Sequence, residues 1–142
     1  MKNYKQYFVM YPSYSVVLSR GCNGNCSICG GGANIAKKVY NRPKISTRNP
    51  KIVVNEIIKL YQQNKIEIFD IIYDSCSTKD ILTIKIIEIL GKQFPKKFIF
   101  NIECFRLPNY KLIDAVSKHL NKKSVIIISP NFAQEKNRKM HK

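Results

Sequence analysis

The chain has 142 residues, of which 44% are apolar and 24% charged, and this balance favours one folded domain over a disordered chain. No stretch approaches the roughly 20 consecutive apolar residues of a membrane-spanning helix, and no secretory signal is recognisable, so we expect a cytoplasmic protein with no membrane partner. The net charge of +16 has two explanations, a compositional bias toward lysine, isoleucine and asparagine, or a polyanionic partner such as nucleic acid or an anionic surface. Because the lysines are spread through every segment, without a block longer than two residues, the sequence does not favour nucleic acid as that partner.

Short β-branched runs alternate with longer helical patterns from residue 15 onward. The predicted strands are residues 15–18, 66–73, 98–102 and 125–128. The last three are nearly continuous apolar runs, which is typical of parallel strands covered on both faces. With helices between the strands, the order β-α-β-α-β-α-β predicts an α/β fold with parallel strands, either an open sheet or part of a (β/α) barrel.

The three predicted helices have recognisable boundaries. Asn49 and Pro50 supply a cap and a first-turn proline for the first helix. The run Ser77-Thr78-Lys79-Asp80 resembles a capping box for the second, which is predicted to end at Gly91. The third begins near Pro108-Asn109. The apolar positions predicted to face the core are Val53, Ile57, Leu60 and Tyr61, then Ile81, Ile84, Ile87 and Leu90, then Ile113, Val116 and Leu120.

Three cysteines, Cys22, Cys26 and Cys29, follow the first strand in the spacing Cys-x3-Cys-x2-Cys. They lie at the carboxyl end of that strand, the edge where α/β folds gather ligand sites. Structural zinc and a 4Fe–4S cluster each normally take four protein ligands. A 4Fe–4S cluster held by three cysteines leaves one iron open for chemistry. Zinc completed by Cys76 or Cys104 is the alternative, although both residues are explained more simply as ordinary small buried side chains.

This arrangement resembles the radical S-adenosylmethionine (SAM) signature. The runs Ser19-Arg20-Gly21-Cys22 and Cys26-Ser27-Ile28-Cys29-Gly30-Gly31, the helix start at Asn49-Pro50, and Ile128-Ser129-Pro130 are similar to family members that often carry an N-terminal cobalamin-binding domain. The similarity covers roughly residues 12–142. It implies that residues 15–142 are the N-terminal four β/α units of a radical SAM partial (β/α)6 barrel, preceded by an extension over residues 1–14. Four strands in place of six lead us to expect a core that is truncated at its C-terminus.

The resemblance also implies an activity. In this family the open iron is chelated by the amino and carboxylate groups of SAM, an electron passes from the cluster to the sulfonium, and the resulting 5'-deoxyadenosyl radical takes a hydrogen from the substrate. Arg106 would pair with the SAM carboxylate or with a neighbouring acid. Asp74 or Ser75 would receive the SAM ammonium group, because they stand where the family has a Gly-Gly-Glu-type segment. The SAM-binding residues expected from the resemblance are Gly30, Gly31, Asp74, Ser75, Glu103, Ser129 and Asn131.

The expected partners follow from the same resemblance. They are SAM, a substrate that the sequence does not identify, an electron donor such as a flavodoxin or a ferredoxin, and cobalamin if a domain absent from this chain supplies it. The alternative hypothesis is a small basic zinc-binding module that contacts nucleic acid without catalysis.

Overall fold

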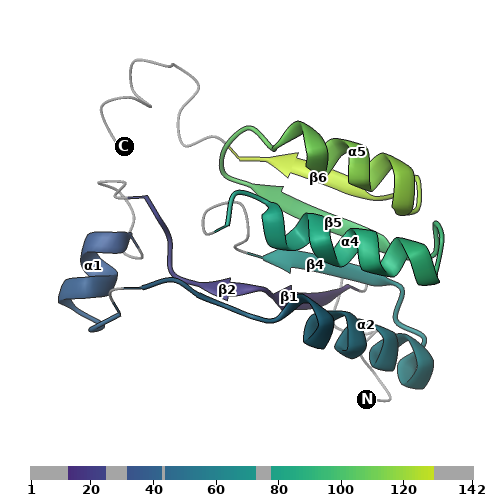
Figure 1. The fold of residues 1–142 in the computed structure, drawn as a ribbon, viewed down its shortest axis with the longest axis horizontal. Coiled ribbons are helices and arrows are strands. Elements are labelled where there is room, and N and C mark those ends of the chain that lie inside the picture. Colours follow the sequence, from purple (N-terminus) through teal and green to yellow (C-terminus); the bar gives the residue numbers. More distant parts are fainter. Residues whose placement is uncertain (1–12, 25–31, 43, 73–77, 130–142) are drawn as a thin grey trace.

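The computed structural model describes residues 13–24, 32–42, 44–72 and 78–129. Four strands form a parallel sheet in the order β1-β4-β5-β6, so neighbours in the sheet follow one another along the chain (Figure 1). The predicted α/β fold with parallel strands is confirmed. The elements are β1 (Tyr14–Val17), β2 (Ser19–Arg20), α1 (Ala33–Lys38), β3 (Ser46–Thr47), α2 (Pro50–Asn64), β4 (Ile68–Ile72), α4 (Ile81–Gln93), β5 (Ile99–Cys104), α5 (Tyr110–His119) and β6 (Val125–Ile128).

The helices α2, α4 and α5 all pack on one face of this sheet (Figure 1). Alternate strand residues such as Phe69 and Phe100 are fully buried beneath them, whereas Asp70 and Asn101 point to the opposite face and are half-buried. The prediction that strands are covered on both faces is therefore wrong for the described residues, where no helix lies on that second face. Successive right-handed crossovers between neighbouring strands place every helix on the same side.

The predicted starts of the first and third helices are confirmed. Asn49 caps α2, because its side-chain oxygen accepts a hydrogen bond from Lys51 N at 2.9 Å. Asn109 caps α5 in the same way, accepting from Lys111 N at 3.0 Å. Pro50 occupies the first turn of α2, where its missing N–H leaves no partner unsatisfied.

The buried faces of α4 and α5 match the prediction only in part, since Ile87, Leu90 and Leu120 are buried as predicted. Ile81 and Ile113 are 52% and 51% exposed, and the core instead contains the residues that follow or precede them, Leu82 in α4 and Leu112 in α5. Two adjacent residues are apolar in each case, Ile81 and Leu82 in α4 and Leu112 and Ile113 in α5. The helical period alone therefore does not decide which residue of each pair faces the sheet.

Gly91 does not end α4, which continues to Gln93. It is buried where α4 and α5 approach each other, and a Cβ at this position would lie 2.4 Å from the Cβ of His119. Close helix packing, rather than termination, is thus the structural reason for glycine here.

A two-stranded antiparallel ribbon and a short helix were not predicted. β2 pairs with β3 through Ser19–Thr47 and Arg20–Ser46, and α1 lies between them in the chain. Ribbon and helix project beyond the carboxyl edge of the parallel sheet (Figure 1). Among the described residues, no helix has the length and apolar character that crossing a membrane requires.

Candidate metal and cofactor site

Cys22 follows the ribbon strand β2, beyond the carboxyl edge of the parallel sheet. β1 continues through Leu18 into β2, and Gly21 then turns the backbone with a φ of +101°, a conformation that favours glycine. A Cβ on Gly21 would also lie 3.3 Å from the Cγ1 atom of Ile45, the residue that precedes β3. The ribbon therefore holds the chain in place directly before the first cysteine.

The sulfur of Cys22 receives a backbone hydrogen bond. Gly24 N lies 3.2 Å from Cys22 Sγ, and the Cys22 side chain is half-buried. A backbone N–H directed at sulfur stabilises negative charge on that atom, and such bonds are among the protein groups that tune iron–sulfur clusters. The environment of Cys22 therefore fits a thiolate ligand.

A second backbone hydrogen bond brings together the two ends of the cysteine loop. Ala33 N donates to Gly24 O at 2.8 Å, which places the start of α1 beside Gly24, two residues after Cys22. Cys26, Cys29, Gly30 and Gly31 fall between these ends in the sequence, and all four lie outside the described residues. Within the described residues, no three His, Cys, Asp or Glu side chains come together as a metal site.

Glu103 and Ser129, two of the expected SAM contacts, meet at the carboxyl edge of the sheet. Ser129 Oγ donates to Glu103 Oε1 at 3.2 Å, and Ser129 N donates to the carbonyl of Cys104 at 2.9 Å. The register of β5 with β6 brings them together, because Cys104 pairs with Ile128. Of the other expected contacts, Asp74, Ser75 and Asn131 lie outside the described residues.

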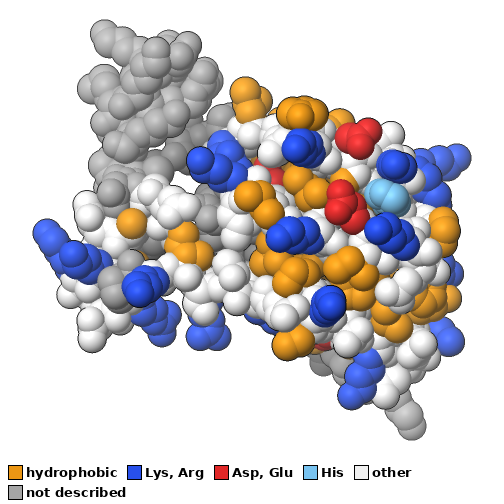
Figure 2. All heavy atoms as spheres, viewed as in Figure 1, with side chains coloured by type: hydrophobic (Ala, Val, Ile, Leu, Met, Phe, Trp, Pro, Cys, Tyr) orange, Lys and Arg blue, Asp and Glu red, His pale blue; other side chains and the backbone are white. Residues whose placement is uncertain are grey.

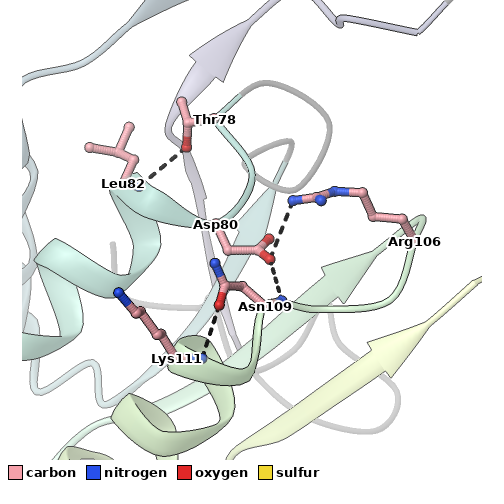
Figure 3. A network of polar contacts seen from close by, with 6 residues as sticks. All are labelled: Thr78, Asp80, Leu82, Arg106, Asn109 and Lys111. Atoms are coloured by element: carbon pink, nitrogen blue, oxygen red, sulfur yellow. Dashed lines mark hydrogen bonds and ion pairs between the residues drawn. The ribbon is translucent and has the colours of Figure 1, made fainter.

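Arg106 pairs with an acid of the protein (Figure 3). Its Nη2 atom lies 3.4 Å from Oδ2 of Asp80, a side chain that is only 2% exposed, and Asn109 N donates to the same oxygen at 2.9 Å. Of the predicted capping box, Ser77 lies outside the described residues, and the Asp80 side chain makes no capping hydrogen bond to α4. Thr78 Oγ1 instead accepts from Leu82 N at 3.2 Å. The Asp80 carboxylate thus connects the start of α4 to the start of α5.

Three polar residues on the uncovered sheet face were missed by sequence reasoning. Asp70 Oδ1 accepts from Asn101 Nδ2 at 2.8 Å, and Asp70 Oδ2 accepts from Ser13 Oγ. Asp70 and Asn101 are register partners in the middle of β4 and β5. Their signal in the sequence is a polar residue between a phenylalanine and an isoleucine, and it was overlooked because these strands were predicted to be covered on both faces.

Cys104 belongs to the hydrophobic core. Its side chain is 0% exposed and shares the helix-covered face of β5 with Phe100 and Ile102. Its interpretation as an ordinary buried residue is confirmed, and a zinc site completed by Cys104 would require this residue to leave the core. Cys76, the other distant cysteine, lies outside the described residues.

Comparison of the chain with protein-family models, with curated proteins and with solved structures found no match. The relationship to the radical SAM superfamily accordingly stays a prediction from the cysteine spacing and its place in the chain.

Proposed function

We propose that this chain is part of a radical SAM enzyme, in which Cys22, Cys26 and Cys29 hold a 4Fe–4S cluster and SAM binds at the remaining iron. The observation that carries the proposal is the setting of Cys22. It follows the first strand of a parallel sheet, lies outside the core, and accepts a backbone hydrogen bond at its sulfur. Three cysteines within eight residues of the sequence suit a cluster with one open iron better than a structural zinc site, which takes four protein ligands.

The sheet topology supports a partial (β/α)6 barrel. Doubly wound sheets reverse their strand order and carry helices on both faces. Here the strands follow the chain order and the long helices share one face. In a barrel the other face becomes the interior, and on that face Asp70 and Asn101 satisfy each other by a hydrogen bond. These four strands would be the first four of the barrel.

The protein side chains have separate roles in this proposal. The three thiolates hold the metal centre, and the Gly24 N–H stabilises charge on the first of them. Ser129 offers a hydroxyl at the strand edge for the ribose of SAM, and Glu103, which accepts a hydrogen bond from Ser129, adds a carboxylate to the same edge. Asp74 or Ser75 accepts the SAM ammonium group, Gly30 and Gly31 allow the backbone to approach, and Asn131 contributes beside Ser129. When bound, the cluster supplies the electron that cleaves the SAM sulfonium, and a flavodoxin or ferredoxin would replenish it.

Anaerobic reconstitution tests the proposal. The wild-type chain is expected to become brown and to bind about four irons and four sulfides. Single Ala replacements of Cys22, Cys26 and Cys29 are expected to abolish the cluster. Cys104→Ala is the matched control, because its thiol lies in the core and its loss should leave the iron content unchanged. Reduction in the presence of SAM should release 5'-deoxyadenosine from the wild type and from Cys104→Ala, but not from the three variants that lack a cluster cysteine.

One tightly bound zinc with no iron would contradict the proposal and support the alternative, a small basic zinc-binding module. A cluster that forms equally well without Cys22 would also contradict it, since the first ligand would then lie elsewhere.

A further inference from the structure

The acidic residues are absent from a whole section of the chain. Residues 1–55 contain nine of the 25 Lys and Arg residues and none of the nine Asp and Glu residues, the first of which is Glu56. The remaining chain holds sixteen cationic residues together with all nine acids. The high net charge is therefore distributed unevenly, and its acid-free section includes the three cysteines.

The structure gathers part of this section into a projecting unit, here called the basic arm. It consists of residues 19–24, 32–42 and 44–47, which contain β2, α1 and β3 and extend beyond the sheet edge (Figure 1). In the view of Figure 2 the arm shows blue side chains without red ones, whereas the helical body shows both. Its five Lys and Arg side chains are all exposed, namely Arg20, Lys37, Lys38, Arg42 and Lys44.

These five charges have no acidic partner among the described residues. The three ion pairs there use Arg48, Lys97 and Arg106, all of which lie outside the basic arm. α1 buries none of its own residues, so the cations do not serve to cover an apolar helix face. Lys37 and Lys38 do occupy the last turn of α1, where the helix dipole favours cations, but this explanation does not extend to the other three.

A chain of phosphates fits this surface better than other anions. Like charges gathered without counterions repel one another, and a polyanion relieves that repulsion while releasing its own counterions. The exposed ring of Tyr40, 58% accessible, stands between Lys38 and Arg42 in the chain, and nucleic-acid bases stack on such rings. Membrane-surface helices instead carry a broad apolar face, whereas α1 has six residues, of which only Ile35 is an exposed large apolar side chain.

We propose that the basic arm binds nucleic acid through the phosphate backbone, with Tyr40 stacking on a base. The arm also carries Cys22, so the bound strand lies on the same projecting unit as this cysteine. This interaction goes beyond the proposed radical SAM activity and depends on neither the cluster nor SAM.

Fluorescence anisotropy with the full chain tests the proposal, using labelled single-stranded RNA and DNA and a DNA duplex of one sequence. If all five cations engage a single strand, the slope of log affinity against log salt is about −3.5, since each phosphate contributes about −0.7. Replacing Lys37, Lys38, Arg42 and Lys44 with Gln should make that slope shallower by about 2.8 and weaken binding on the order of 100-fold near physiological salt. The RNA and DNA arms determine which nucleic acid is preferred.

A matched control variant distinguishes binding at the basic arm from binding that depends only on the net charge of the protein. Lys85, Lys92, Lys111 and Lys118 are exposed on α4 and α5, and changing these four to Gln removes the same total charge. The proposal expects this control to keep the wild-type slope and affinity. An equal loss in both variants would show that binding follows net charge, and the assignment to the arm would be overturned.

Two further measurements complete the test. Tyr40→Ala should weaken single-strand binding about 5-fold or more while Tyr40→Phe retains it, and equal affinity of the Ala variant would overturn the stacking contact. If the four-site variant does not fold, lysine acetylation of the wild type decides: the oligonucleotide should protect Lys37, Lys38 and Lys44 but not Lys85. Absence of protection, or binding to anionic phospholipid vesicles without binding to oligonucleotides, would overturn the proposal.

Discussion

Replacement of Asp80 is expected to disconnect α4 from α5. The carboxylate is 2% exposed, it accepts the Asn109 N–H at 2.9 Å, and it pairs with Arg106 at 3.4 Å (Figure 3). Asp80 also adopts a left-handed backbone with a φ of 69°, at the position directly before α4. Ala removes the acceptor and is strained in that conformation, whereas Asn keeps an acceptor oxygen and tolerates the backbone.

Three contributions set the size of the effect. Loss of the hydrogen bond from Asn109 N to a charged acceptor costs about 1.5–3 kcal/mol. The ion pair adds at most about 1 kcal/mol, because Arg106 is 39% exposed and water screens it. The left-handed backbone costs Ala about 1–2 kcal/mol more than Asp. We therefore expect Asp80→Ala to lower the free energy of unfolding by about 3–5 kcal/mol and Asp80→Asn by about 1 kcal/mol.

Urea unfolding followed by circular dichroism measures both variants. Asp114→Ala is the control, because Asp114 is exposed on α5 and its loss should change the free energy by less than about 0.5 kcal/mol. If Asp80→Ala and Asp80→Asn are destabilised equally, the left-handed backbone and the retained acceptor have no measurable effect, and the reasoning from this network is refuted.

Three other outcomes are expected. Ser129→Ala should weaken SAM binding to the reconstituted chain by about 1 kcal/mol, or roughly 5-fold, and unchanged affinity in a titration would place the ribose contact elsewhere. Gly91→Ala should lower the melting temperature despite its better helix propensity, because the new Cβ meets His119 at 2.4 Å, and a raised melting temperature would contradict this packing. The hydrogen bond to Glu67 raises the pKa of Lys97 above 10.5, so the stability this residue adds should be present below pH 10.5 and lost as the pH rises through the raised pKa. Melting of Lys97→Met against wild type across alkaline pH checks this, and a difference that does not shrink would contradict it.

Local signals in the sequence determined the four parallel strands, the three long helices and their order. Asn49 is a cap in the structure as predicted, and Asn109, at the predicted start of the third helix, caps α5. A cap of this kind joins residues two apart and depends on nothing distant in the chain. The strands likewise appear at the β-branched runs, and residues 125–128 match β6 at both ends. The cysteine spacing, and the hypothesis built on it, also come from the sequence alone.

Tertiary structure decided which faces and which distant residues meet. The Asp80 carboxylate accepts a hydrogen bond from the backbone of Asn109, 29 residues further along the chain. Glu103 meets Ser129 because β5 and β6 pair in a fixed register. Packing between distant parts of the chain also decided which faces of α4 and α5 are buried and where the basic arm projects. The local hydrogen bonds and steric preferences that form helices and caps act over about four residues. The face that a helix buries and the partner of a buried carboxylate depend instead on how the helices and the sheet pack together.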